Sequence, residues 1–459
     1  MAAYLYRAIA TPTSTKIFTF STWVKSHSDA STDTGVVCAA LIGNSSYRFN
    51  IQFGAGLIQM GGSGLDIQTV RKFRDPAAWW NIVVAVDTSQ GTDTNRCKLY
   101  VNGEAVTLTG TFPTQDSTTT FCDSAASIYI GQGVNAGAAL SKPFNGLQAH
   151  THFIDGTAYT PTAFGETDAT SGIWKPKTSP SVTYGNNGFF LKYASGAHGT
   201  DSSGNGNDYT ISGTLTNTKD TPQNNFCTWN PMDVAHDQTY TFENGNTVCL
   251  IPSASGWRGC NGTLGAAAGK WYMEGYINYT PGAYNTTFGF TSGLRAAQKG
   301  TMGQIGYADK GAQPEYGVSF GIYDTGTLLY STTSANNQQT ASWCTPWAAG
   351  DYLMFAIDID GGKFYFGANG TWDTTNSNDP AAGTGGYTFT KGTLGGPEFF
   401  FPTTTVYQEQ LDMNFGNGYF ATTVAGTNAD ANDEGAFKYT PPTGFYALCT
   451  NNLKLYGAP

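Results

Sequence analysis

Residues 350–373, GDYLMFAIDIDGGKFYFGANGTWD, predict a β-hairpin. The pair Gly361 and Gly362 can adopt the positive φ angles of a tight turn, and residues 363–366 then run back beside the first strand. In the first strand apolar side chains recur at every second position and so share one face: Leu353, Phe355, Ile357 and Ile359. The stretch therefore predicts antiparallel β structure in this half of the chain.

A second hairpin of the same plan is predicted far upstream. Residues 79–86 (WWNIVVAV) form its first strand, residues 87–93 a polar turn, and residues 97–103 (CKLYVNG) its return strand. Its ending, KLYVNG, is similar to the KFYFGANG of residues 363–370. Each half of the chain thus carries one copy of the same kind of unit.

Length and composition favour two all-β domains. The chain has 459 residues, which is more than one ordinary β core needs, and only 12% of them are charged, which disfavours long surface helices. The net charge of −10, with no dense Lys/Arg surface, argues against a nucleic-acid partner.

The N-terminus has no secretory signal pattern, and no window is apolar enough to insert into a membrane.

The eight cysteines are scattered and form no C-x-x-C pair. We expect them to be small buried hydrophobes, with a zinc site or disulfides as the alternative.

Differences in composition and in the pattern of polar and apolar residues divide the chain into three parts. Residues 1–200 contain short strands of alternating polarity and are predicted to form one antiparallel β-sandwich. Residues 201–232 are rich in turn formers and prolines, yet carry apolar anchors, and are predicted to be an ordered connector. Residues 233–459 are predicted to form a second β-sandwich, and no segment has a strong helical period.

Both halves resemble known families. The second half resembles a SPRY domain, through GKWYMEGYI (269–277), YGVSFGIYD (316–324), the hairpin of residues 350–373, EFFFP (398–402) and MNFGNGYF (413–420). The first half resembles laminin-G-like, concanavalin-A-like jelly rolls, through FTFSTWV (18–24), WWNIVVAVD (79–87), KLYVNGE (98–104) and FNGLQAHTHFIDG (144–156). The resemblances imply two different β-sandwiches in tandem.

The combination resembles structural proteins of tailed bacteriophages, especially marine ones. The segments that carry this resemblance are IDGTAYTPTAFGE (154–166), YGNNGFFLKY (184–193), DSSGNGNDY (201–209) and DTPQNNFCTWNPM (220–232). It implies a non-catalytic surface or appendage protein of the virion, of the tail-fibre or receptor-binding type, that is made in the host cytoplasm and recognises a host glycan or protein receptor. By analogy it also implies contacts with other virion proteins and a homo-oligomer, with a trimer as the first expectation. The alternative is a capsid-decorating or head-fibre protein.

Motifs for catalysis are absent from the sequence. Retaining glycosidases need two carboxyl groups about 5 Å apart, and the nearest candidate pair, Asp358 and Asp360, is interpreted as strand-end structure. No G-x-S-x-G, H-E-x-x-H or phosphate-binding loop motif occurs. We therefore expect no enzyme, with a glycan depolymerase as the alternative.

Two groups of side chains could hold a metal ion. His150 and His152 lie at i and i+2 of an expected strand, so with Asp155 they could form a site, but solvent-facing or packed histidines are favoured and the metal site is the alternative. Asp201, Asn205 and Asn207 supply the oxygen atoms that calcium prefers, but the twelfth position of an EF-hand would be Ser212. Asx-turn structure is favoured there, calcium is the alternative, and no other cofactor is expected.

Ligand contacts are predicted in loops of the second sandwich. Sugars stack on aromatic faces, while Asn, Asp and Arg side chains hydrogen-bond their hydroxyl groups. SPRY domains bind through loops at one end of the sandwich, so the resemblance agrees with this prediction. For each residue taken singly packing is the favoured interpretation and a ligand contact the alternative; the candidate set is Trp257, Arg258, Tyr284, Asn285, Trp372 and Asp373.

Overall fold

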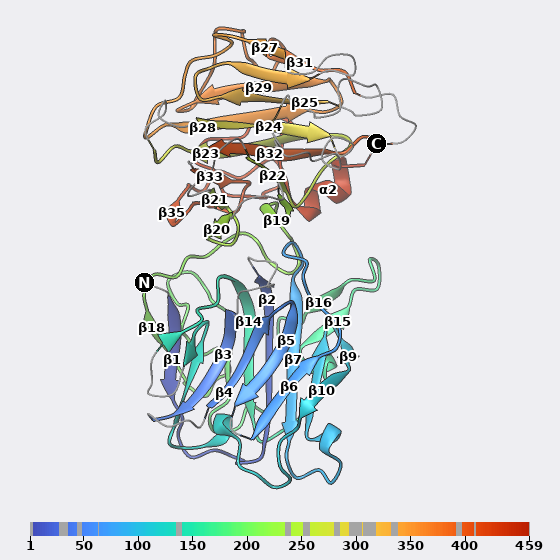
Figure 1. Cartoon of the computed structure of the whole chain (residues 1–459), viewed down its shortest axis with the longest axis vertical. Coiled ribbons are helices and arrows are strands. Elements are labelled where there is room, and N and C mark those ends of the chain that lie inside the picture. The colour runs from blue at the N-terminus through green and yellow to red at the C-terminus, as the bar shows by residue number, and fades with distance from the viewer. Residues whose placement is uncertain are drawn as a thin grey trace. The chain divides into compact units, whose positions relative to one another are not determined.

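The computed structural model contains two compact units, residues 1–217 and 218–459, which we describe separately (Figure 1). The residues described are 3–26, 35–43, 48–62, 64–134, 140–234, 240–250, 258–279, 285–292, 305, 318–331, 338–391, 397–407 and 410–458. Both units are all-β, as the sequence predicts. Among the described residues, the pairings between named strands are antiparallel except for one parallel pair in the second unit.

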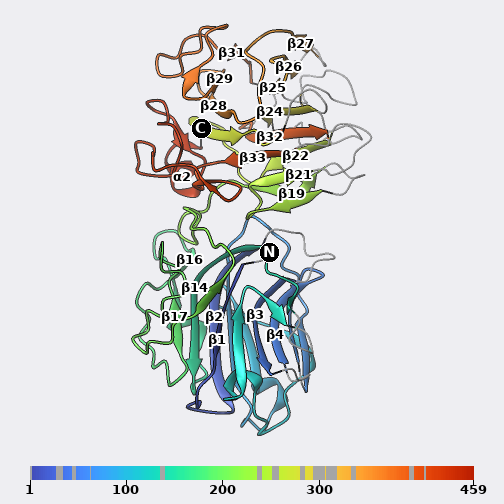
Figure 2. The ribbon, with the colours of Figure 1, turned by 90° about the vertical axis from the view of Figure 1, so that its left-hand side faces the viewer.

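The first unit is a sandwich of two sheets, which Figures 1 and 2 show as stacked layers. The larger sheet has the order β10 (Leu108–Thr111), β6 (Leu65–Thr69), β5 (Leu57–Gly62), β4 (Arg48–Gly54), β3 (Gly35–Ile42), β11 (Ala126–Ile130), β1 (Tyr4–Ala8), β18 (Thr210–Ser212). The smaller sheet has the order β17 (Phe189–Leu191), β14 (Gly146–Asp155), β2 (Ile17–Ser26), β7 (Trp80–Asp87), β8 (Cys97–Val101), β9 (Glu104–Val106). Short elements complete the unit: β12 (Gly133–Val134), β13 (Leu140–Ser141), β15 (Gly165–Thr167), β16 (Trp174–Pro176) and the 3₁₀ turns at Asp93–Asn95, Thr120–Cys122 and Pro161–Ala163.

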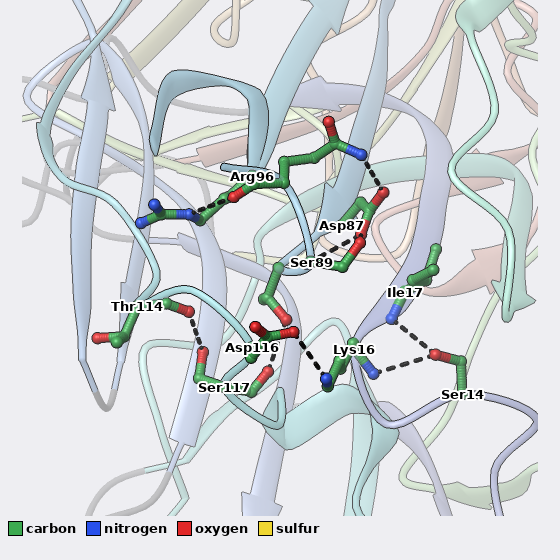
Figure 3. Close-up of polar contacts among 11 residues, drawn as sticks. Ser14, Lys16, Ile17, Asp87, Ser89, Arg96, Thr114, Asp116 and Ser117 are labelled. Carbon is green, nitrogen blue, oxygen red and sulfur yellow. Dashed lines mark hydrogen bonds and ion pairs between the residues drawn. The ribbon is translucent and has the colours of Figure 1, made fainter. Parts of the chain in front are cut away.

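The core between these sheets comes from the alternating positions of the strands. Phe18, Phe49 and Phe121 are buried there within 6 Å of one another, ring centre to ring centre. The predicted upstream hairpin is β7 and β8, which pair from Ile82–Val101 to Val86–Cys97. Its long turn is held by polar contacts, among which the hydroxyl of Ser89 donates to Asp87 at 2.6 Å (Figure 3). Arg96 also donates to the backbone carbonyls of Gln90, Gly91 and Pro113 at 2.9 Å each.

The second unit is also a two-sheet sandwich. One sheet has the order β19 (Trp229–Val234), β22 (Arg258–Gly262), β32 (Phe400–Tyr407), β24 (Asn285–Ser292), β25 (Ser319–Tyr323), β26 (Leu328–Ser331), β27 (Gln338–Thr340). The other has the order β20 (Thr241–Glu243), β21 (Val248–Leu250), β33 (Gln410–Asn414), β23 (Lys270–Tyr276), β28 (Tyr352–Asp358), β29 (Lys363–Ala368), β30 (Thr371–Trp372), with β31 (Tyr387–Thr388) paired to β29 and β36 (Tyr446–Ala447) parallel to β23. A hairpin of β34 (Tyr419–Phe420) and β35 (Thr423–Val424) and the helix α2 (Thr450–Tyr456) follow.

The hairpin predicted at residues 350–373 is β28 and β29, and its turn contains Gly361 and Gly362. The alternate apolar residues face the core as expected. The other face of β28, at Met354 and Ala356, is buried as well, because residues of the C-terminal segment pack on it. Both faces of this hairpin are therefore covered.

Glu274 ties the C-terminal segment to that face. It lies on β23 with 0% of its surface exposed, and its carboxylate accepts hydrogen bonds from the backbone N–H groups of Lys438 (2.9 Å) and Tyr439 (2.8 Å). The hydroxyl of Tyr272 donates to it at 2.9 Å, and Asn414 also donates to it at 3.3 Å. Burial raises the pKa of Glu274, and these four hydrogen bonds partly offset that shift.

The segment expected to be a connector, residues 201–232, is shared between the units. Its first part stays with the first sandwich, where Tyr209 packs on Phe189 with ring centres 4.7 Å apart and β18 pairs with β1. Its last part enters the second sandwich with β19.

All eight cysteine side chains are buried, as expected of small hydrophobes. Within the part of the chain that the structure describes, no helix has the length and apolar character to cross a membrane.

Candidate functional site

The strands of the second unit bring Arg258, Asn285 and Trp372, one residue from each predicted aromatic–polar pair, to one end of the sandwich. In the first sheet Arg258 lies opposite Val406, and Asn285 lies opposite Tyr407, both at the end of β32. β33 starts at Gln410, directly after the short connection from β32. The two sheets therefore meet at this end through one tight link.

The other sheet places Trp372 at the same end. Tyr276 pairs with Asp412 near the start of β33, and also with Tyr352 at the start of β28. Ala368, at the end of β29, pairs with Leu353 and turns into β30, which contains Trp372. We call this region the loop end, defined by the strand termini at Arg258, Asn285, Tyr323, Tyr352 and Ala368 and the loops beside them.

Four members of the predicted set are only partly described. Trp257 and Tyr284 lie outside the described residues, and Arg258 and Asn285 are described as strand residues without their side chains. The sequence-based prediction that they contact a ligand therefore stays a prediction. The backbone positions of Arg258 and Asn285 place both at the loop end, on the two strands that flank the end of β32.

Asp373 and Trp372 take part in the internal structure of the loop end. Asp373 is buried, and its Oδ2 accepts hydrogen bonds from the backbone N–H and the hydroxyl of Thr345, both at 2.9 Å. Its Oδ1 accepts from the backbone N–H of Thr375 at 2.9 Å. Trp372 is half-buried and makes an edge contact with Tyr272, at 6.3 Å between ring centres. Asp373 thus fixes the loop, while Trp372 keeps part of its surface exposed.

Residues 341–351 form an ordered bridge across the loop end. The backbone N–H groups of Trp343 and Cys344 both donate to the carbonyl of Gly326, and Trp347 donates to the carbonyl of Asp324. At the far side of the bridge, the carbonyl of Asp351 accepts from Ile277. These bonds connect the turn between β25 and β26 to the end of β23, so the loop end has a rigid frame.

Asp324 is the most unusual side chain of the loop end. It is 1% exposed, its Oδ1 has no hydrogen-bond partner among the described residues, and its Oδ2 accepts a long hydrogen bond of 3.4 Å from the backbone nitrogen of Thr286. Burial raises the pKa of Asp324 to about 6, and the backbone hydrogen bonds to its carboxylate, which lower the pKa, offset only part of this rise. The hydroxyl of Thr286 is also buried without a partner. A carboxylate held in this way is typical of sites selected for something other than stability.

An aromatic platform lies beside the frame and was not predicted. Tyr276 and Tyr352 lie 4.7 Å apart, Phe420 is 5.1 Å from Tyr352, and the ammonium group of Lys438 lies 4.1 Å from the centre of the Tyr352 ring. Tyr276, Tyr352 and Lys438 are half-buried and are thus accessible in part. The segments that contribute these residues are far apart in the sequence. The alternating polarity of β23 and β28 could have predicted a shared strand face for Tyr276 and Tyr352, but no sequence signal points to Phe420 or Lys438.

The possible calcium ligands form an Asx-turn clasp in the first unit. The carboxylate of Asp201 accepts from the backbone N–H groups of Phe190 (2.9 Å), Ser203 (2.8 Å) and Asn207 (2.9 Å). Asn205 and Asn207 both donate to the carbonyl of Gly188, and the Oδ1 of Asn207 accepts from Arg7 at 2.5 Å. The carboxylate of Asp201 and the Oδ1 of Asn207 are thus engaged in hydrogen bonds within the clasp. Among the residues described, no group of three or more His, Cys, Asp or Glu side chains could hold a metal ion.

The two histidines pack around one phenylalanine. His150 has a φ of 47° at a β-bulge, so it does not share a regular strand face with His152. The ring of Phe190 lies 5.9 Å from His150 and 3.9 Å from His152. The Nδ1 atom of His152 is 3.0 Å from the hydroxyl of Tyr184, and burial lowers the pKa of His152 well below its ordinary value. Packing accounts for both rings.

The acidic pair at the hairpin end is also internal. Asp358 forms an ion pair with Lys270 at 3.0 Å and accepts from the backbone N–H of Gly361 at 2.7 Å. Asp360 accepts from the backbone N–H of Gly269 at 3.0 Å. Both carboxylates cap strand ends, as the sequence analysis favoured.

One family model matches part of the first unit. Residues 4–161 match the family described as the concanavalin A-like lectin/glucanases superfamily. A search of curated proteins found no significant match. Among solved structures, the SPRY domain of human HERC1 is 14% identical, with 40% of this chain and 96% of that chain covered and a TM-score of 0.27.

Two further solved structures are similar. A heptameric SAP-like pentraxin from Limulus polyphemus is 16% identical, with 35% of this chain and 72% of that chain covered and a TM-score of 0.26. The CBM40 of the IT-sialidase from Ruminococcus gnavus is 15% identical, with 31% of this chain and 86% of that chain covered and a TM-score of 0.23. These likenesses concern the fold.

Proposed function

We propose that this chain is a non-catalytic binding protein that engages a surface glycan or protein through the loop end of its second unit. The observation that carries the proposal is that Arg258, Asn285 and Trp372, one residue from each predicted aromatic–polar pair, lie at one end of the sandwich. The bridge of residues 341–351 links the turn between β25 and β26 to the end of β23 by backbone hydrogen bonds, and a preorganised frame loses little entropy on binding. The poorly partnered carboxylate of Asp324 is further support, because buried groups of this kind cluster at functional sites.

We place this binding protein on the surface of a bacteriophage virion. The support is the resemblance of residues 154–166, 184–193, 201–209 and 220–232 to phage structural proteins. In that setting the chain is a tail-fibre or receptor-binding type of protein that recognises the host, contacts other virion proteins and forms a homo-oligomer, with a trimer as the first expectation. Neither a resident metal nor a cofactor is part of the proposal.

The test of the binding site uses the full chain, labelled with a fluorophore, on an array of bacterial surface glycans and on intact bacteria. We expect Trp257→Ala combined with Tyr284→Ala to weaken binding by about tenfold or more, as loss of central aromatic contacts does. Phe399→Ala is the matched control, because Phe399 is an exposed aromatic residue beside the start of β32, at the opposite end of the unit. Equal binding by the double variant and the wild-type chain would contradict the proposed site.

The virion setting has its own test. Antibodies against the chain should label purified phage particles in electron micrographs, and added chain should block adsorption of the phage to its host. Labelling of the head without any block of adsorption would favour the capsid-decorating alternative. Release of short oligosaccharides from a bound polysaccharide would favour the depolymerase alternative.

A further inference from the structure

A row of three glutamine side chains crosses the outer face of the larger sheet in the first unit. Gln52 on β4, Gln59 on β5 and Gln68 on β6 are direct cross-strand partners. The Nε2 of Gln52 donates to the Oε1 of Gln59 at 2.9 Å, and the Nε2 of Gln59 donates to the Oε1 of Gln68 at 3.3 Å. Their sequence neighbours Ile51, Phe53, Ile58 and Ile67 are buried in the core. Alternation therefore puts the three amides on the face away from the core.

The row is partly exposed and leaves hydrogen-bonding capacity free. Each amide has two donor hydrogens and an acceptor oxygen with two lone pairs, and the ladder uses only some of them. Thr109, the partner of Gln68 on β10, extends the row with an exposed hydroxyl. Donors and acceptors side by side are the groups that recognise sugar hydroxyls.

A basic segment follows directly at the end of β6. Arg71, Lys72 and Arg74 are exposed, and Val70 beside them is 63% exposed. None of the three cations forms an ion pair within the part of the chain described here. In a chain of net charge −10 with 23 Lys and Arg residues, three cations within four positions that form no ion pair with the described residues are a local exception, and the guanidinium of Arg71 lies 5.2 Å from the centre of the Phe73 ring.

Phe73 holds the basic segment against the sheet. Its side chain is buried in the core, and its backbone N–H donates to the carbonyl of Gly56 at 2.6 Å. Gly56 lies in the turn between β4 and β5, and a Cβ placed on it would be 2.9 Å from the side chain of Arg74. Arg74 therefore crosses the turn that ends the strands carrying Gln52 and Gln59.

Asp66 and Asp75 are near these cations in the sequence, and among the described residues neither forms an ion pair with them. Asp75 follows Arg74 but accepts the backbone N–H of Ala77 at 2.8 Å. Asp66 is exposed on β6, two residues before Gln68 and on the side of the row away from the basic segment. The face is thus positive at one end and polar in the middle.

We propose that this amide–arginine face, made of Gln52, Gln59, Gln68, Arg71, Lys72 and Arg74, binds a carboxylate-bearing polysaccharide. Guanidinium groups match carboxylates through paired hydrogen bonds, and the amide row matches the hydroxyl groups of the same polymer. The row spans β4 to β6, which is about 10 Å at the usual strand spacing, so a polymer rather than a small ion would cover it. The site belongs to the first unit and does not depend on the function proposed for the loop end.

The experiment measures binding of the full chain to polygalacturonate, with neutral dextran, dextran sulfate and a single-stranded DNA as comparison ligands. We expect polygalacturonate to bind, neutral dextran to bind much more weakly, and added salt to weaken the complex. Arg71→Gln combined with Arg74→Gln should weaken polygalacturonate binding by about tenfold or more, because charge-assisted contacts are lost. The matched control, Lys98→Gln combined with Lys177→Gln, removes the same charge elsewhere in the unit and should change binding less than about twofold.

A third variant separates the amide row from simple charge attraction. Gln59→Ala should weaken polygalacturonate binding several-fold while leaving its salt dependence unchanged, because no charge is removed. Urea unfolding of each variant checks that the first unit stays folded. Absence of polygalacturonate binding, equal loss in the control pair, no effect of Gln59→Ala, or tighter binding of dextran sulfate or of the DNA would each overturn the proposal.

Discussion

Asp324 shows how one residue can mark a site that stability alone does not explain. A buried carboxylate without full hydrogen bonding costs free energy, and an amide of the same shape would avoid the charge. Its position at the turn between β25 and β26, bridged to Trp347 by a backbone hydrogen bond, puts it inside the loop end rather than in the general core. The sequence places Asp324 at the end of a strand, but only the register of the sheets shows which other residues share that end.

We predict that Asp324→Asn stabilises the second unit at neutral pH. Burial raises the pKa of the folded carboxyl to about 6 from 3.8, so between these values the folded state holds more protons than the unfolded state. Stability contributed by the neutral form is therefore present below about pH 4 and is lost as the pH rises toward about 6. The variant should gain about 1–2 kcal/mol at pH 8 and nothing at pH 4.

Urea unfolding at both pH values checks this. Glu243→Gln, which changes an exposed carboxylate on β20, is the control and should shift stability at neither pH. Equal stability of Asp324→Asn and the wild-type chain at pH 8 would mean that Asp324 is well solvated.

Among the elements, the two hairpins were predicted most completely, because their signals are local. Alternating apolar residues and a Gly-Gly turn identified β28 and β29, and the similar ending of residues 97–103 identified β8. The burial of both faces of β28 could not be predicted in the same way. It depends on Phe437 and Phe445, which come from a segment far along the chain.

In the candidate site, too, local sequence signals predicted some features, while others depend on contacts between distant segments. Trp257, Tyr284 and Trp372 were selected as aromatic residues in loops, which composition and spacing allow. That their segments converge follows from pairings between strands well over a hundred residues apart in the chain, such as β22 with β32, and these are non-local. Asp373 was selected by the same reasoning, yet its carboxylate accepts hydrogen bonds inside the loop end, because sequence cannot tell an exposed turn carboxylate from a buried one.

At the turn of the central hairpin we predict that Gly362→Ala destabilises the second unit by about 2 kcal/mol. Gly362 has a φ of 62°, and a Cβ there would lie 2.6 Å from the carbonyl oxygen of Phe389. Gly383→Ala is the matched control, because Gly383 has a φ of 72° with nothing within 4 Å of its Cβ position. It should cost only about 1 kcal/mol, the conformational part of the effect.

Thermal and urea unfolding of both glycine variants measure the difference. A loss no larger for Gly362→Ala than for Gly383→Ala would show that the β28–β29 turn shifts to accommodate a methyl group.

At the scale of the whole molecule, each unit has the parts of an independent domain. The first has one large core between its two sheets, and the second has a core between its sheets and a smaller one beneath the C-terminal segment. The boundary after Asn217 differs from a sequence-based boundary at residue 200 by the segment that contains Tyr209 and β18. A chain truncated before that segment and one truncated after it therefore test where the first domain ends.

We predict that residues 1–217 and residues 218–459 fold separately, and that residues 1–200 do not form a stable domain. Truncation at 200 removes β18, leaves β1 as an unpaired edge, and removes Tyr209 from the core beside Phe189. It also removes Asp201, whose carboxylate accepts the backbone N–H of Phe190. Loss of a buried aromatic residue alone costs about 3–5 kcal/mol, a large share of a domain's stability.

Circular dichroism and urea unfolding should therefore give one cooperative transition for each long fragment and a weakened or absent transition for residues 1–200. The 1–217 fragment should keep polygalacturonate binding and the 218–459 fragment should keep binding to the glycan array, and a 1–200 fragment as stable as 1–217 would contradict the placement of the boundary.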